Sequence, residues 1–206
     1  LKIIGITGTS GKTTITYLIR AMLEEAGARS GLIGTIGNVI NGRKLPASYT
    51  TPGPLRLNEL FLEMVNQNLD YAVMEVSSHS LKLHRVEGLK CEVGVFTNLT
   101  QDHLDFHKTF EDYFCSKQKL FEQSKRAVIN IDDKSGERLL RTVDIPAWTY
   151  GIKNNADLMA KNIRVSEKGV FYDLVFENKR YPVFYAVPGL FSVYNSLAAL
   201  ATGVAL

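Results

Sequence analysis

A glycine-rich stretch near the start of the chain places the strongest constraint on its fold. Residues 5–14 read Gly-Ile-Thr-Gly-Thr-Ser-Gly-Lys-Thr-Thr and continue the apolar run of residues 1–6. Glycines let the backbone curl so that successive N–H groups point at phosphate oxygens, and a following helix turns its positive end toward the same anion. Lys12 adds a cation for the outer phosphates, and the Thr13 hydroxyl is suited to Mg²⁺. The stretch therefore predicts a strand, a phosphate-binding loop and a helix.

This loop departs from the general P-loop pattern at one position. That pattern has a glycine five positions before Gly11, where this chain has Ile6. Its nearest glycine on that side is Gly8, which is closer to Gly11 in the sequence. A glycine-rich turn that holds no ligand is the structural alternative. The Gly-Lys-Thr-Thr run that opens a helix favours phosphate binding. The residues expected at the nucleotide are Gly8, Thr9, Ser10, Gly11, Lys12, Thr13 and Thr14.

Composition limits the number of domains and the classes of partner. The 206 residues are 45% hydrophobic, which suits one well-buried α/β domain and leaves no room for a second full one. The 24 basic and 21 acidic residues give a net charge of +3 without a long basic run, so nucleic acid is not indicated. Two cysteines, no secretory leader and no membrane-length apolar segment predict a protein of the reducing cytoplasm that does not bind membranes. We expect a monomer. We also expect a piece of a longer chain, because the sequence starts inside a strand pattern and stops inside a helix pattern.

Hydrophobic periodicity predicts an α/β fold with a mostly parallel sheet flanked by helices. Strand patterns alternate with helix patterns as far as about Gly151. Asn41-Gly42 predicts a tight hairpin after the second strand. The strand patterns cover residues 1–6, 30–35, 71–75, 91–97, 126–131 and 145–150. Helix patterns include residues 13–27 and 55–68, one after the loop that ends at residue 107 and one that ends near residue 142.

The character of the chain changes over residues 157–187. Three β-type runs, at 158–165, 170–176 and 181–187, are joined by short polar turns. This spacing predicts a small three-stranded antiparallel sheet, a meander, within a single domain of residues 1–206. A last helix is expected over residues 191–206.

An acidic residue ends the buried-strand pattern of residues 71–75. Glu75 is followed at once by Val-Ser-Ser-His. A strand that delivers a carboxylate beside a phosphate loop resembles a Walker-B arrangement, whose carboxylate holds Mg²⁺ against the nucleotide. The alternative is that Glu75 only caps the turn that follows it. The phosphate loop at the front of the chain favours the metal site.

Two histidines follow the strand pattern of residues 91–97. His103 and His107 are four residues apart, a spacing that a transition-metal pair can use. No third His or Cys has ligand spacing, so zinc is not supported. A single imidazole that assists at a Mg²⁺–phosphate site is favoured, with His103 as the candidate.

A lysine interrupts the apolar face of the helix expected after the loop that ends at residue 107. Lys117 falls in the middle of a face made by Phe110, Tyr113, Phe114, Leu120 and Phe121. Full burial lowers a lysine pKa by ~3–5 units, and a neutral amine is a nucleophile. The alternative is a lysine that extends along its own stem to water. Periodicity alone leaves both open.

Assembled, these motifs resemble the Mur ligase family, most closely its MurE-type members. The resemblance covers the whole chain as that family's central ATP-binding domain, and residues 8–14 are similar to the family's own shortened phosphate loop. Leu83 stands where some members have glutamine. The further motifs that match in order are residues 50–52 (Thr-Thr-Pro), 74–79, 97–105, 112–117 and 194–199.

The resemblance implies an ATP-dependent ligase that adds the third amino acid to UDP-N-acetylmuramoyl-L-alanyl-D-glutamate in peptidoglycan synthesis. In such enzymes ATP phosphorylates a substrate carboxylate, and an amine then displaces the phosphate to leave an amide. The cofactors implied are ATP and Mg²⁺. The full-length enzyme would take the UDP-muramoyl dipeptide and an amino acid as partners, with further domains that this fragment lacks, so the fragment alone is expected to be inactive.

The resemblance also implies roles for single residues. Thr13 and Glu75 would hold one Mg²⁺, and His103 with a carbamylated Lys117 would serve a second, so that Lys12, Lys117 and His103 form the catalytic set. Asn195 would lie at the nucleotide. The residues that would contact the UDP-muramoyl peptide are Thr50, Thr51, Ser77 and Arg85.

Two other functions remain open at this stage. One is a different Mur-like ligase, such as a folylpolyglutamate synthase, against which the Thr-Thr-Pro and Ser-Ser-His runs argue. The other is a P-loop phosphotransferase or a non-catalytic nucleotide-binding module. Phosphoryl transfer to a hydroxyl, without an amide product, would identify the phosphotransferase.

Overall fold

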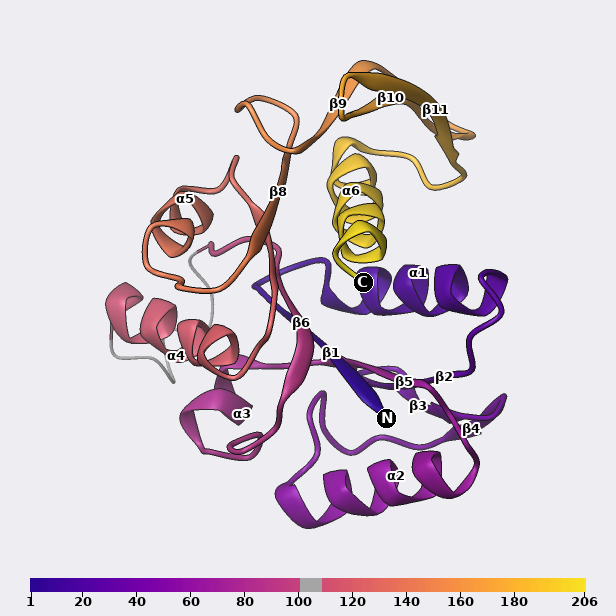
Figure 1. Ribbon diagram of the computed structural model, residues 1–206, viewed down its shortest axis with the longest axis vertical. Coiled ribbons are helices and arrows are strands. Elements are labelled where there is room, and N and C mark those ends of the chain that lie inside the picture. The colour runs from indigo at the N-terminus through magenta and orange to yellow at the C-terminus, as the bar shows by residue number, and fades with distance from the viewer. Residues whose placement is uncertain (101–108) are drawn as a thin grey trace.

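The computed structural model describes residues 1–100 and 109–206. In this part of the chain a single sheet of eleven strands has the order β11-β10-β9-β8-β7-β6-β1-β5-β2-β3-β4 (Figure 1). The strands are β1 (Lys2–Thr7), β2 (Ser30–Gly34), β3 (Gly37–Ile40), β4 (Arg43–Leu45), β5 (Tyr71–Glu75), β6 (Cys91–Phe96), β7 (Ala127–Asn130), β8 (Ala147–Gly151), β9 (Leu158–Ser166), β10 (Gly169–Phe176) and β11 (Lys179–Tyr185). The helices are α1 (Lys12–Glu25), α2 (Pro54–Asn66), α3 (Ser78–Lys82), α4 (Phe110–Glu122), α5 (Lys134–Leu140) and α6 (Leu190–Ala205).

The central strands confirm the predicted parallel sheet. β2, β5, β1, β6, β7 and β8 pair parallel in that order. Because their carboxyl ends lie at one edge of the sheet, the loops that follow β1, β5 and β6 meet there. Ligands of open α/β sheets bind at this edge.

The hairpin that Asn41-Gly42 predicts joins β3 to β4. Asn41 has φ 49° and Gly42 has φ 78°, so both residues adopt the left-handed conformation of a tight two-residue turn. β3 pairs antiparallel with β2 on its other side. The hairpin therefore ends the sheet with two antiparallel strands.

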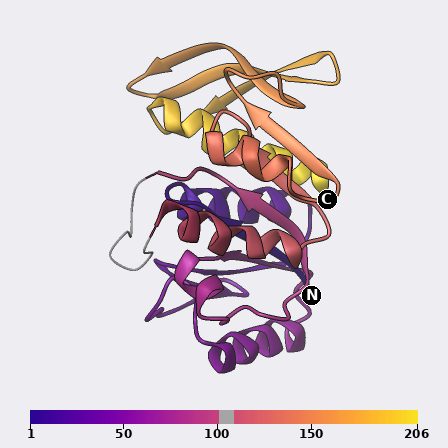
Figure 2. The same cartoon turned by 90° about the vertical axis from the view of Figure 1, so that its left-hand side faces the viewer.

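The three strands β9, β10 and β11 form the expected antiparallel meander. They are not detached from the main sheet, because β9 pairs parallel with β8 through Tyr150–Leu158 and Gly151–Met159. Figures 1 and 2 show the meander and α6 at one end of the molecule and α2 at the other. The sheet is thus continuous from the hairpin to the meander.

Helices cover both faces of the sheet and divide the core into two layers. α1 and α6 pack on one face, where Ile15, Ile19 and Leu197 are almost completely buried. α2, α3, α4 and α5 pack on the other, with Leu60 and Phe114 among the buried side chains. The apolar stripes read from the sequence are the faces these helices bury. No helix in residues 1–100 and 109–206 is both long and apolar enough to cross a membrane.

The start of α4 differs from the sequence expectation at one residue. Phe110 is 42% exposed, because it is the first residue of the helix and lies outside the buried face. The Thr109 hydroxyl caps this end by accepting the Asp112 N–H at 3.1 Å. The other four apolar residues of the predicted face are buried, and Lys117 is buried among them.

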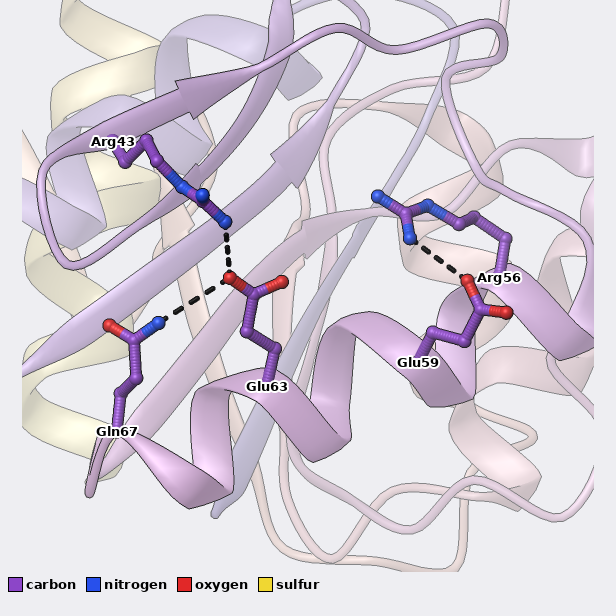
Figure 3. A network of polar contacts seen from close by, with 5 residues as sticks. All are labelled: Arg43, Arg56, Glu59, Glu63 and Gln67. Atoms are coloured by element: carbon purple, nitrogen blue, oxygen red, sulfur yellow. Dashed lines mark hydrogen bonds and ion pairs between the residues drawn. The ribbon is translucent and has the colours of Figure 1, made fainter.

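Polar contacts on the outer side of α2 connect it to the hairpin (Figure 3). Glu63 accepts from Arg43 of β4 and, at 3.4 Å, from Gln67 at the end of the helix. Arg56 and Glu59 pair at 2.9 Å along the same helix. Arg43, Arg56 and Glu59 are exposed and Glu63 is partly exposed, so each ion pair stabilises the fold by no more than about 1 kcal/mol. The apolar face of α2 holds the helix in place.

We predict that alanine destabilises the fold at one helical glycine and does not at another. A Cβ on Gly136 of α5 would lie 1.8 Å from the Asn130 carbonyl oxygen, whereas one on Gly203 of α6 would meet only the flexible end of Met22, at 3.1 Å. Gly136→Ala should lower the free energy of unfolding by about 1–3 kcal/mol through overpacking. Gly203→Ala should leave it unchanged or raise it by up to about 1 kcal/mol, because alanine favours helix. Urea denaturation of both variants measures this, and equal midpoints would contradict it.

Candidate nucleotide site

The phosphate loop lies between the end of β1 and the start of α1, and it needs glycine at two positions. Gly8 has φ 151° and Gly11 has φ 88°. A Cβ on Gly8 would lie 1.8 Å from the Thr97 hydroxyl oxygen, and a Cβ on Gly11 would lie 2.6 Å from the Asn195 amide oxygen. Gly8 is therefore the glycine that this shortened loop requires, in place of one at Ile6.

The end of β6 fixes the backbone of the loop. Thr9 N–H donates to the Asn98 carbonyl at 2.9 Å, and Ser10 N–H donates to the Asn98 side chain at 3.0 Å. The Thr97 hydroxyl donates to the Ser10 carbonyl at 2.7 Å. The first turn of α1, where Lys12, Thr13 and Thr14 lie, leaves backbone N–H groups without helical partners, which suits an anion.

Two lysines converge on one carbonyl of the loop. Lys12 Nζ donates to the carbonyls of Gly8 and Thr9, each at 2.9 Å. Lys117 Nζ, from α4, donates to the same Gly8 carbonyl at 2.9 Å and lies 4.5 Å from the centre of the Tyr113 ring. Lys117 is only 2% exposed. Its amine is therefore buried beside the phosphate loop and does not reach out to water along its stem.

Glu75 ends β5 beside the start of α1. Its carboxylate accepts from the Thr13 hydroxyl at 2.9 Å, from Thr35 N–H at 2.8 Å and from the Thr35 hydroxyl at 3.1 Å. The residue is 1% exposed. The cap of α3 is the Ser77 side chain, which accepts from Ser80 N–H, so Glu75 does not cap that turn. A buried carboxylate next to threonine hydroxyls is an all-oxygen donor set, which fits Mg²⁺.

The four residues expected at the peptide substrate lie next to Glu75. The Thr51 hydroxyl donates to the Glu75 carbonyl at 2.9 Å and accepts from Ser77 N–H at 3.0 Å. The Thr50 and Thr35 hydroxyl oxygens lie 3.0 Å apart, and Arg85 donates to the Thr51 carbonyl at 3.4 Å. Thr51 is almost fully buried. Its hydroxyl therefore shapes the loop, while Thr50 and Arg85 are more accessible.

A cavity of about 350 Å³ adjoins the phosphate loop on the side away from Glu75. Asn195, near the start of α6, is among its lining residues. Sequence reasoning assigned no role to the other lining residues outside the loop. These are Asn98, Thr100, Asn130, Asp132, Asp133, Phe191 and Tyr194.

Asp132, which lines this cavity, accepts hydrogen bonds from two other segments of the chain. It accepts backbone N–H bonds from Ile152 at 2.6 Å, Lys153 at 2.9 Å and Asn154 at 2.8 Å, and the Tyr194 hydroxyl donates to it at 2.9 Å. Burial alone would raise the pKa of this carboxyl, but the backbone and tyrosine donors bring it below its usual value of 3.8. Asp132 is therefore an anion at neutral pH.

Thr35 is a further residue that sequence reasoning missed. Among the described residues it contributes two of the three donors to the Glu75 carboxylate, and it follows the end of β2. Its position in the sequence could have suggested this role. Thr35 follows a strand expected to run parallel to the Glu75 strand, and the ends of parallel strands meet at one edge of the sheet. A Cβ on Gly34 would lie 2.4 Å from the Glu75 carboxylate, which explains the glycine before Thr35.

The structure thus brings together the phosphate loop, Lys117, Glu75, Asn195 and the substrate-loop residues at one edge of the sheet. His103 and His107 lie outside the described residues. Among the residues that the structure does describe, no group of three or more His, Cys, Asp or Glu side chains gathers at one place.

Comparison with protein families identifies the domain. The family model described as Mur ligase middle domain matches residues 6–203. The chain belongs to the Mur ligase family. The expected resemblance is confirmed over almost the whole chain.

Relatives of this Mur ligase domain include UDP-N-acetylmuramoyl-L-alanyl-D-glutamate–2,6-diaminopimelate ligase 1 of Clostridium acetobutylicum, 52% identical over 201 residues. That match covers 98% of this chain and 42% of the relative. The 2,6-diaminopimelate ligase of the same name from Bacillus velezensis is 44% identical over 214 residues. That match covers 100% of this chain and 44% of the relative. The chain therefore spans less than half the length of these curated relatives.

Solved structures agree with the family assignment. A structure of a UDP-N-acetylmuramoyl-L-alanyl-D-glutamate–2,6-diaminopimelate ligase superposes with a TM-score of 0.91 and 33% identity, over 100% of this chain and 44% of that one. MurF from Thermotoga maritima in complex with ADP gives a TM-score of 0.71 at 19% identity, over 98% of this chain and 44% of that one. The second match shows the shared fold alone.

Proposed function

We propose that this domain binds ATP within a ligase that adds the third amino acid to UDP-N-acetylmuramoyl-L-alanyl-D-glutamate. The observation that carries the proposal is the convergence of Lys12 and Lys117 on the Gly8 carbonyl, at the loop that Thr13 connects to the buried Glu75. Relatives named as 2,6-diaminopimelate ligases support diaminopimelate as the added amino acid. The reaction would pass through an acyl phosphate on the substrate carboxylate, from which an amine displaces phosphate. The cytoplasmic location and monomeric state remain predictions from the sequence.

The phosphate loop would hold the nucleotide through charges fixed in advance. The first turn of α1 presents backbone N–H groups to an anion. Lys12 Nζ is already at the loop, held by two carbonyls, so little reorganisation is needed for it to meet the outer phosphates. Positive charge placed before the reaction stabilises the transferring phosphoryl group most effectively.

Thr13 and Glu75 would hold one Mg²⁺, and His103 with a carbamylated Lys117 would hold a second. Bound Mg²⁺ would supply neutralisation of the phosphate charge. The buried, hydrogen-bonded carboxylate of Glu75 supports the first site. For the second, Lys117 is enclosed at the loop, and a carbamate there would provide the anionic oxygen that a hard cation prefers.

Thr50, Ser77 and Arg85 would bind the UDP-muramoyl peptide, and the buried Thr51 would shape the loop that presents them. Their loops lie directly beside Glu75, so a carboxylate held by the Arg85 guanidinium would lie near the phosphoryl donor. The Arg85 guanidinium also lies 5.2 Å from the centre of the Tyr49 ring, which limits its orientations. Lys12, Arg85 and Glu75 would in this way bring the two reacting groups together.

The experiment that tests this function is a coupled assay on the full-length enzyme. With ATP, Mg²⁺, the UDP-muramoyl dipeptide and diaminopimelate, we expect the release of one ADP for each amide formed. A parallel assay with lysine in place of diaminopimelate gives the comparison. The 206-residue chain alone should form no amide, because positioning of the two substrates can account for ~7–11 kcal/mol of the barrier. ADP release with phosphate transferred to a hydroxyl would instead identify a phosphotransferase.

We predict that Lys117→Ala in the full-length enzyme nearly eliminates ligation and leaves ADP binding at the phosphate loop largely intact. The physical reason is the loss of the group that would carry the carbamate. Small carboxylates such as acetate should restore part of the activity, because they can supply the missing anionic oxygens.

The matched control is Lys119→Ala, which changes a lysine of the same helix whose side chain is more exposed than that of Lys117. It should retain the parent rate. Circular dichroism checks that both variants fold. A Lys117→Ala enzyme that works within a few-fold of the parent would remove Lys117 from the catalytic set.

A further inference from the structure

Asp132 connects three parts of the fold that are distant in sequence. It follows β7, it binds three successive N–H groups of the turn after β8, and it accepts the Tyr194 hydroxyl from α6. A Cβ on Gly151 would lie 2.9 Å from one of its carboxylate oxygens, so the carboxylate packs tightly against that backbone. Its acceptors are used within the protein, and Asp132 therefore holds the fold around the cavity.

Tyr194 lies where α6 meets the phosphate loop. The next residue, Asn195, approaches Gly11 so closely that no side chain fits there. Phe191, one helical turn before Tyr194, lines the same cavity and is 63% exposed. Two aromatic rings on the first turns of α6 therefore face the cavity together with Ser10 and Gly11 of the loop.

We propose that Asp132 is a positioning residue that, through Tyr194, fixes the aromatic wall of the cavity in which the nucleoside end of ATP binds. This inference rests on the proposed ATP binding and concerns how the cavity is shaped. A nucleobase binds aromatic side chains through its flat face. A wall whose orientation is set before binding has less freedom to lose when the ligand arrives.

The electrostatics of the pair support a fixed contact. Burial and the Asp132 carboxylate both raise the pKa of Tyr194, so its hydroxyl remains a donor at neutral pH. Hydrogen bonds to a charged acceptor are stronger than neutral ones. The Tyr194 ring is therefore held at its outer end by Asp132 and at its inner end by the helix.

The chain offers a matched control for this contact. The Tyr172 hydroxyl lies 2.8 Å from the Ser196 hydroxyl, so it also connects the sheet to α6. Tyr172 is buried and is not among the residues that line the cavity. Tyr172→Phe and Tyr194→Phe each remove one hydroxyl that contacts another part of the fold, and only the second contact is at the cavity.

The experiment measures the dissociation constant of Mg-ADP by calorimetry, and KM for ATP with kcat, in the full-length enzyme. Tyr194→Phe should raise the ADP dissociation constant and KM for ATP about fivefold, the effect of one hydrogen bond, with kcat at saturating ATP changed less than twofold. Tyr172→Phe should lower the melting temperature and leave ADP affinity unchanged. Asp132→Asn should weaken ADP binding at least as much as Tyr194→Phe, and the double variant should bind no more weakly than Asp132→Asn.

Each outcome decides the inference. Equal ADP affinity in Tyr194→Phe and the parent would overturn it while the proposed function stands. Equal weakening by Tyr172→Phe would also overturn it, because a general loss of stability would then explain the effect. Additive losses in the double variant would show that Asp132 does not act through Tyr194. A parent that binds no ADP would overturn both this inference and the proposed function.

Discussion

The carbonyl of Gly8 is the point on which the candidate site depends. It accepts hydrogen bonds from Lys12 at the start of α1 and from Lys117 in α4, and so it joins both helices to the loop after β1. A buried amine is stable only where acceptors surround it. Because the Thr97 hydroxyl fills the space where a side chain of residue 8 would lie, only glycine lets this carbonyl turn toward the lysines. The conformation of one loop thus fixes where positive charge gathers.

Local features predicted those parts of the structure that depend on neighbours in sequence. The glycines of residues 8 and 11 and the following helical stripe predicted the strand, loop and helix, and Asn41-Gly42 predicted the hairpin turn. Glu75 was expected near the loop because a carboxylate at the end of a buried strand resembles a Walker-B arrangement, and its bond to Thr13 agrees with that reasoning. The apolar stripe left open whether Lys117 is buried or extends to water, and the structure shows it buried. The roles of these residues in catalysis remain predictions.

Contacts between distant segments could not be predicted in the same way. Asp132 and Tyr194 are brought together by the position of α6 over β7 and β8, which periodicity does not specify. Asn98 holds the loop only because β6 is the neighbour of β1, and strand order is a property of the whole sheet. The pairing of β9 with β8, which makes the meander part of the main sheet, depends on the same order. Phe110 was placed on the buried face because a helical pattern does not mark its own first residue.

An amide chemical-shift titration of the isotopically labelled chain with ADP and Mg²⁺ tests the account most directly. The largest shifts should occur at the first turn of α1, at Gly11 and at Asn195, because these groups face the anion and the cavity. Strands β9, β10 and β11 should change little, apart from residues that contact α6. Saturable shifts confined to the meander, or none at the start of α1, would contradict the assignment of this loop as the nucleotide site.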